Sequence, residues 1–135
     1  MEKIEILLVE DNAGDAVLIR QILAEAAVPV NLHIVRDGEQ ALTLLSDAQF
    51  RPALIILDLN IPRISGMALL HQWKTVRTPI VVFSSSLNDA ERSRALELGA
   101  REFIPKPTDI EAFTTAVCGI VERYAERSHE TASGA

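Results

Sequence analysis

The chain has 135 residues, of which 48% are hydrophobic; this fits one domain with a substantial core and excludes a disordered protein. Its net charge of −6 argues against DNA or RNA as the main partner, because nucleic-acid phosphates require a basic surface. No apolar run approaches the ~18 residues of a membrane span, and the start does not resemble a signal peptide. We therefore expect a cytoplasmic protein, and we interpret the single cysteine, Cys118, as a small core residue.

Short apolar runs alternate with helical patterns along the chain. Continuous apolar runs favour strands that are buried on both faces, whereas apolar residues spaced three and four apart favour amphipathic helices. Asn12 and Asn88 are suitable N-caps, and Gly99 is a helix stop signal. In chain order, the predicted elements are a strand over 4–9, a helix over 13–26, a strand over 32–35, a short helix over 41–45, a strand over 54–57, a helix over 67–76, a strand over 80–83, a helix over 89–98, a strand over 102–104 and a helix over 109–127.

Alternating strands and helices predict an α/β fold with a doubly wound parallel sheet that is covered by helices on both faces. In such sheets, ligands bind at the carboxyl ends of the strands. Glu10 and Asp11 follow the first predicted strand and Asp58 follows the third, so three carboxylates should gather on one rim. Carboxylates ~4 Å apart repel by roughly 4 kcal/mol per pair at an effective dielectric near ~20. The rim therefore requires a cation, either a divalent metal ion or a lysine.

Two further polar residues end predicted strands, Ser84 after the fourth and Lys106 after the fifth. Asp58 stands alone after its strand, and a carboxylate there can attack a phosphoryl group to form an acyl phosphate. Phosphoryl transfer depends on positioning and charge neutralisation, which Lys106 can supply, while the Ser84 hydroxyl can donate to a phosphoryl oxygen. Glu10 and Asp11, together with Asp58, offer the hard oxygen ligands that magnesium accepts.

Each of these residues alone has an ordinary structural explanation. An acidic pair after a strand can simply complement a helix dipole. Asp58 alone can be a turn residue, and Ser84 alone can be an ordinary loop residue. Lys106 alone can be a solvated surface cation. The joint pattern favours a functional site, because all of these residues fall at strand ends in an order that the fold permits.

This set of residues, in this order, resembles the receiver domain of two-component response regulators. The resemblance covers about residues 4 to 126, nearly the whole chain. It implies a flavodoxin-like (βα)5 receiver fold with strand order 2-1-3-4-5. The motifs that carry it are the Glu10-Asp11 pair, the Asp58-Leu59-Asn60-Ile61-Pro62 run with Gly66 beyond it, Ser84 five residues after Pro79, and Lys106-Pro107.

The resemblance implies a role for each rim residue. Asp58 would accept a phosphoryl group from a histidine kinase. Magnesium would be held by Asp11, Asp58 and the backbone carbonyl of Asn60, with Glu10 helping through a water molecule. Such a protein catalyses only its own phosphorylation and dephosphorylation, so we do not expect another enzymatic activity.

The resemblance also implies a switch. Ser84 matches the switch hydroxyl and Phe103, three residues before Lys106, matches the switch aromatic, while Lys106 would neutralise the phosphoryl group. Serine replaces the commoner threonine at 84, and Phe103 lacks a ring hydroxyl, so its burial would depend on apolar area alone. Pro105 stands where an apolar strand residue is usual; because proline lacks an N–H donor, it suits an edge strand.

A finer resemblance is to the small regulators that serve cyanobacterial and bacterial phytochromes. It is carried by the Val-Glu-Asp-Asn-Ala-Gly-Asp run over 9–15 and by the Asp-Leu-Asn-Ile-Pro loop, and it implies a bacteriophytochrome as the kinase. We expect a receiver domain over 1–127, a disordered tail over 128–135 and no output domain. The effector would then be another protein or a second copy of the chain, bound through the fourth helix, fifth strand and fifth helix, about Asp89 to Tyr124.

Three other functions remain open at this point. A magnesium-dependent aspartyl-phosphate phosphatase also uses a nucleophilic aspartate, but it normally has a second acid two residues later, where this chain has Asn60. A flavodoxin-like cofactor binder needs a phosphate-binding loop after the first strand, and two acids there would repel a phosphate. A phosphorylation-independent docking module would not need the complete set of rim residues.

Overall fold

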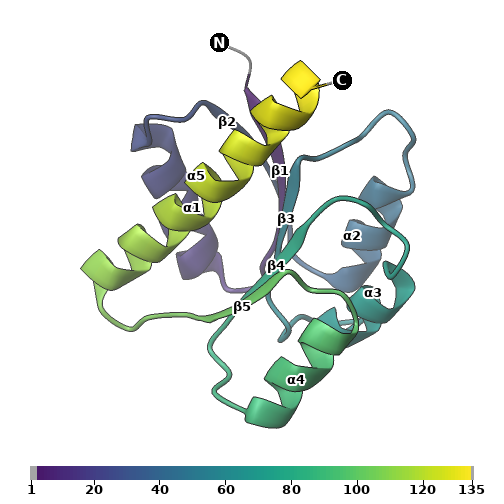
Figure 1. The fold of residues 1–135 in the computed structure, drawn as a ribbon. Helices are drawn as coiled ribbons and strands as arrows, with labels where there is room; N and C mark the ends of the chain where they lie inside the picture. Colours follow the sequence, from purple (N-terminus) through teal and green to yellow (C-terminus); the bar gives the residue numbers. More distant parts are fainter. Residues whose placement is uncertain (1–2, 135) are drawn as a thin grey trace.

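The computed structural model describes residues 3–134, with side chains described for residues 3–126. Five strands alternate with five helices along the chain, which confirms the predicted α/β class (Figure 1). In chain order, the elements are β1 (Ile4–Val9), α1 (Ala13–Glu25), β2 (Val30–Val35), α2 (Gly38–Leu45), β3 (Leu54–Leu57), α3 (Gly66–Gln72), β4 (Ile80–Ser84), α4 (Asp89–Glu97), β5 (Glu102–Pro105) and α5 (Ile110–Gly134).

The five strands form one parallel sheet in the order β2-β1-β3-β4-β5, which confirms the predicted topology. The strand order reverses beside β1, which pairs with β2 on one side and with β3 on the other. At the carboxyl end of β1, Val9 is in register with Val35 of β2 and with Leu57 of β3. The residues that follow β1 and β3 therefore lie side by side, at the position where open α/β sheets bind their ligands.

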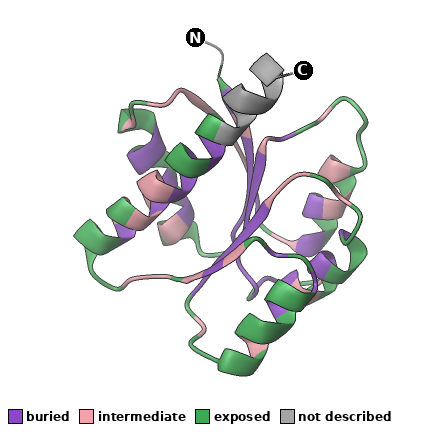
Figure 2. Cartoon of the chain, viewed as in Figure 1, coloured by how far each residue is buried: buried purple, intermediate pink, exposed green. Residues whose placement is uncertain are grey.

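The sheet separates two hydrophobic cores. Helices α1 and α5 cover one face, and α2, α3 and α4 cover the other (Figure 1). Alternate residues of each strand enter opposite cores, so that Leu7 and Val9 pack with α2, α3 and α4, whereas Ile6 and Leu8 pack with α1 and α5. Because both faces are covered, the central strands are buried along their length (Figure 2).

Several boundaries differ from those predicted. β2 begins at Val30 rather than at residue 32, and α3 spans Gly66–Gln72 rather than 67–76. β5 includes Pro105 and pairs only with β4, so this proline lies on an edge strand as expected. The backbone of α5 stays helical to Gly134, past the end expected near Arg127, because no glycine or proline lies between Arg127 and Gly134. The division into a receiver domain and a tail stays a prediction.

The loop between β3 and α3 is held against the start of α2. A Cβ on Gly38 would overlap the backbone carbonyl of Ile64, so only glycine allows this approach. Arg63 adopts a left-handed backbone conformation with φ of 71°, and its guanidinium forms ion pairs with Asp37 at 3.4 Å and Glu39 at 3.5 Å. These contacts fix the path of the loop that follows Asp58.

None of the described helices combines the length and the apolar character needed to cross a membrane.

Candidate functional site

Glu10 directly follows β1 and points into the interior of the rim. Its backbone N–H donates to the Val35 carbonyl at 3.0 Å, which extends the β1–β2 pairing by one step. The residue is only 1% exposed, and its Oε2 accepts a hydrogen bond from the Asn12 N–H at 3.1 Å. The backbone of Glu10 is therefore fixed by the sheet, and one carboxylate oxygen is fixed by the Asn12 N–H.

Asp58 occupies the equivalent position after β3. Its backbone N–H donates to the Val9 carbonyl at 3.0 Å, which places it beside Glu10. The residue is 5% exposed, and its Oδ1 accepts a hydrogen bond from the Asn60 N–H at 3.0 Å. Its second oxygen, Oδ2, points toward the cation described next.

Lys106 follows β5 and supplies the cation that the carboxylates require. Its backbone N–H donates to the Ser84 carbonyl at 2.8 Å, which fixes the start of the side chain beside β4. Its Nζ lies 2.7 Å from Glu10 Oε1, 2.8 Å from Asp58 Oδ2 and 2.9 Å from Asp15 Oδ2. A lysine ammonium has three N–H donors, so these three carboxylates use all of them.

Burial and hydrogen bonding set the charge of each of these groups. Burial raises the pKa of Glu10 from 4.5 to about 7, because the Lys106 hydrogen bond only partly offsets the desolvation of the carboxylate. Burial acts in the same direction on Asp58, but hydrogen bonds from Lys106, from Glu10 and from the Asn60 N–H prevail and lower the pKa of Asp58. The Asp58 oxygens therefore stay ionised at neutral pH, as a nucleophile must.

Burial alone would lower the pKa of Lys106, yet its three carboxylate partners outweigh desolvation and raise that pKa above the ordinary value. Its side chain is 7% exposed, so little water screens these contacts. The ammonium thus remains charged throughout the physiological range.

The structure does not bring every predicted rim residue into this cluster. Asp11 is exposed, and its backbone carbonyl accepts a hydrogen bond from Arg36 Nη2 at 3.0 Å. The Ser84 side chain is fully buried at the end of β4, where its Oγ accepts a 3.5 Å hydrogen bond from the Ser86 N–H. Asn60 contributes its N–H to Asp58 and lies on the exposed side of the loop.

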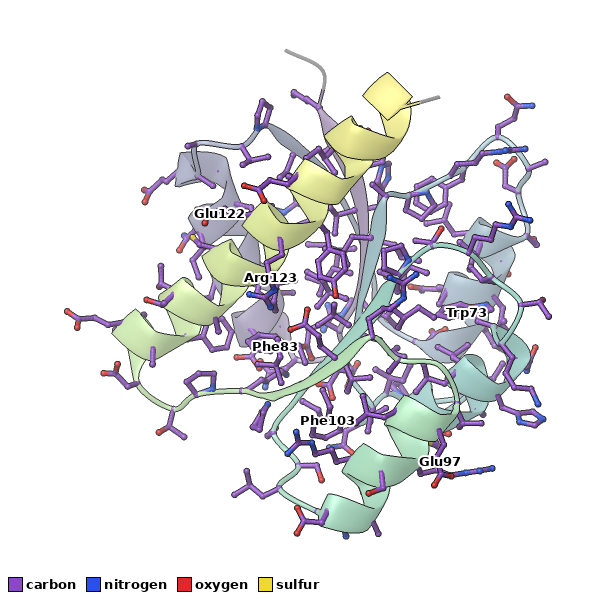
Figure 3. The ribbon with its side chains drawn as sticks, in the orientation of Figure 1. Trp73, Phe83, Glu97, Phe103, Glu122 and Arg123 are labelled. Atoms are coloured by element: carbon purple, nitrogen blue, oxygen red, sulfur yellow. The ribbon has the colours of Figure 1, made fainter. Side chains whose placement is uncertain are left out.

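Phe103 lies in β5 on the side of the sheet next to α4, whereas Phe83 lies toward α5 (Figure 3). Phe103 is 8% exposed and packs with Ala95 and Leu98 of the α4 region. The proposed switch aromatic is therefore already buried, so a phosphoryl group can stabilise this position but can add little buried area.

Sequence reasoning missed Asp15, the third carboxylate on Lys106. Asp15 lies in the first turn of α1, where an acidic residue normally needs no explanation beyond the helix dipole. Asp15 closes the Val-Glu-Asp-Asn-Ala-Gly-Asp run over 9–15, but nothing in that run indicates a contact with a residue that follows β5.

The residues fit a magnesium ion by their chemistry. Glu10 and Asp58 are adjacent buried carboxylates, and the pKa of Glu10 is raised. Together they offer hard oxygen ligands and an excess of negative charge, which a magnesium ion can neutralise. Among the residues that the structure describes, however, no three acidic, histidine or cysteine side chains are arranged to hold a metal ion. A metal would therefore require Glu10 to give up its contact with Lys106 and the Asp11 side chain to turn inward.

Comparison with known proteins identifies the family. A model of the response regulator receiver domain matches residues 6–118. The chain belongs to this family. The match places the chain among the receiver domains of two-component signalling.

Two curated relatives show how far the similarity extends. Response regulator Rcp1 from Synechocystis sp. is 32% identical over 130 residues, which cover 90% of this chain and 88% of that protein. Transcriptional regulatory protein CpxR from Klebsiella pneumoniae is 30% identical over 133 residues, which cover 96% of this chain. The match covers 55% of CpxR, so this chain spans about half the length of that relative.

Solved structures support the finer resemblance to phytochrome-associated regulators. The phosphorylated cyanobacterial phytochrome response regulator RcpA superposes with a TM-score of 0.85 at 34% identity, covering 92% of this chain and 95% of that one. The Mn2+-bound form of Rcp1 superposes with a TM-score of 0.80 at 31% identity, covering 87% and 91% of the two chains. The receiver chain is thus related to phytochrome response regulators, and one of these has been observed with a divalent metal.

Proposed function

We propose that this receiver accepts a phosphoryl group on Asp58 from a histidine kinase and thereby switches its interactions with other proteins. One observation carries the proposal: Asp58 is a buried, ionised carboxylate beside Lys106 at the point where the strand order of the sheet reverses. The similarity to phosphorylated RcpA supports this chemistry.

In the proposed step, an Asp58 carboxylate oxygen attacks the phosphorus of the phosphodonor. A new O–P bond forms while the P–N bond to the kinase imidazole breaks, and the bonding electrons leave with the imidazole nitrogen, which then takes up a proton. Lys106 neutralises charge on the phosphoryl oxygens while the phosphoryl group is transferred, and the Ser84 hydroxyl donates a hydrogen bond to one of these oxygens.

Magnesium is the proposed cofactor, with Asp11, Asp58 and the Asn60 backbone carbonyl as ligands and Glu10 acting through water. When bound, the ion would supply positive charge to the phosphoryl oxygens. Release of Glu10 from Lys106 would free one N–H of that ammonium for the incoming phosphoryl group. The manganese-bound form of the relative Rcp1 supports a divalent metal at such a site.

The proposed output is a change in protein binding. A phosphoryl group carries about −1.5 to −2 charges, which would strengthen the contacts of Ser84 and Lys106 at the ends of β4 and β5 and stabilise the buried position of Phe103. The surface formed by α4, β5 and α5 would then bind a protein target or a second copy of the chain. The relationship to phytochrome regulators favours a bacteriophytochrome as the kinase and the cytoplasm as the setting.

The experiment is phosphorylation with acetyl phosphate and magnesium, read by intact mass. We expect the wild-type protein to gain one phosphoryl group, and Asp58→Asn, which keeps the side-chain shape and loses the nucleophilic charge, to gain none. Peptide mapping of the labelled wild-type protein should place the group on Asp58. Labelling of Asp58→Asn to the wild-type level would overturn the proposal.

A further inference from the structure

We infer that Asp15 is a positioning residue that holds Lys106 in its productive place while Asp58 is phosphorylated. The inference rests on the proposed function and concerns a residue outside the predicted set of rim residues. Asp15 Oδ2 lies 2.9 Å from Lys106 Nζ, a distance typical of a charge-assisted hydrogen bond. The contact joins two residues that are far apart in the sequence, one on α1 and one after β5.

The three partners of Lys106 differ in what the reaction does to them. Asp58 becomes the phosphorylated group, and Glu10 turns toward the metal in the proposed function. Asp15 takes part in neither event, so it is the one carboxylate that can hold Lys106 from the start of the reaction to its end. One N–H then stays on Asp15 while the other two are free for the phosphoryl oxygens.

The local structure gives Asp15 a fixed position for this task. Asn12 caps α1, and its side-chain oxygen accepts a hydrogen bond from the Asp15 N–H at 2.9 Å. The side chain of Asp15 is 29% exposed, whereas that of Lys106 is 7% exposed. The carboxylate therefore stands at the mouth of the site, with the ammonium behind it.

A cavity beside the pair shows why an anchor is needed. It has a volume of about 360 Å³ and is lined by Asp15, Lys106, Ser85 and Thr108, together with apolar residues of α1 and α5. The long lysine side chain has room to swing into this space. The Asp15 carboxylate restrains it, because leaving the site would break a charge-assisted hydrogen bond.

The test compares Asp15→Ala and Asp15→Asn with the wild type, using acetyl phosphate and saturating magnesium. Asparagine keeps an acceptor oxygen near the same place, whereas alanine removes it. We expect Asp15→Ala to lower the maximal rate constant of Asp58 labelling about tenfold, with little change in the half-saturating acetyl phosphate concentration, since the loss of a hydrogen bond to a charged group is worth at least that factor. Asp15→Asn should keep most of the wild-type rate.

A metal-free measurement tests the contact itself. In chelator, we expect the 15Nζ protons of Lys106 to exchange slowly with water in the wild-type protein and much faster in Asp15→Ala. Glu111→Ala is the matched control, because Glu111 is likewise an acid in the first turn of a helix, but it lies on α5 and is exposed. This control should leave both the labelling rate and the Lys106 exchange unchanged.

The outcomes separate the inference from the function on which it rests. A wild-type protein that fails to label at Asp58 overturns both. A wild-type protein that labels, with Asp15→Ala labelling at the same maximal rate, overturns only the role of Asp15. Equal losses in Asp15→Ala and Asp15→Asn also overturn it, because they would show an effect of net charge and not of an anchoring hydrogen bond.

Discussion

At the scale of single residues, Glu10 is the group whose charge depends most on the fold. Its pKa is 4.5 in an unstructured chain and about 7 in the folded protein. The folded state therefore holds this proton more tightly than the unfolded state does. The resulting stabilisation is complete below pH 4.5 and is lost as the pH rises through about 7.

We expect the free energy of unfolding in chelator to fall between pH 5 and pH 8 in the wild-type protein. Each unit of pKa difference is worth about 1.4 kcal/mol, so the fall should be on the order of 1–3 kcal/mol. Glu10→Gln should remove most of it, since a neutral amide can still accept from Lys106 and donate to Asp58. Urea titrations of the wild type and Glu10→Gln across this pH range measure how the free energy of unfolding depends on pH in each protein. The same dependence in both proteins would contradict the prediction. The lowered pKa of Asp58 affects the free energy of unfolding only at a more acidic pH, below this range.

Asp11 gives a second prediction at this scale, because its proposed role is confined to metal binding. Magnesium at ~100 times its dissociation constant should stabilise the wild-type protein by about 2.7 kcal/mol. Asp11→Asn should gain clearly less from magnesium and, in chelator, should melt slightly higher than the wild type because one rim charge is gone. Thermal melts with and without magnesium provide the measurement.

The control for Asp11 is Glu122→Gln, which removes an exposed charge on α5 and should keep the full magnesium response (Figure 3). Equal magnesium responses in Asp11→Asn and the wild type would show that Asp11 does not bind the ion.

At the scale of elements, the close approach of Gly38 to Ile64 couples the start of α2 to the β3–α3 loop. In Gly38→Ala, the new methyl group would overlap the Ile64 backbone, and such overpacking costs about 1–3 kcal/mol. Because the loop also carries Asn60, we expect weaker magnesium binding together with the loss of stability. Urea unfolding and a magnesium titration measure the two effects separately.

Gly119→Ala on α5 is the matched substitution for Gly38→Ala. A Cβ there approaches only the half-exposed end of the Arg123 side chain, at 3.2 Å. We therefore expect Gly119→Ala to raise stability by about 0.5–1 kcal/mol, because alanine is the better helix former, and to leave magnesium binding unchanged. If Gly38→Ala behaves in the same way, the loop is not held by this contact.

At the scale of the whole molecule, the elements and their order could be predicted because the signals are local. The apolar runs of β1 and β3 and the caps at Asn12 and Asn88 lie within a few residues of the structure they specify. The end of α5 could not be predicted, because no helix stop signal in the sequence marks it.

The candidate site was predictable only in part. The strand ends that carry Glu10, Asp58 and Lys106 meet on one rim because the topology requires it. The Asp15 contact depends instead on how α1 packs beside the end of β5, and the exposure of Asp11 depends on which way a single residue turns after β1. Both are tertiary details that no local pattern encodes.

The two separate cores also bear on how a sequence of this kind can diverge. Ile19 packs among the residues of α1 and α5, whereas Leu69 packs among those of α2, α3 and α4, and the sheet lies between them. Substitutions that share no neighbours have effects on stability that add within about 0.5 kcal/mol. One layer can therefore accumulate changes that suit a new kinase or a new target without requiring compensation in the other, while the rim residues between the layers stay constrained by both.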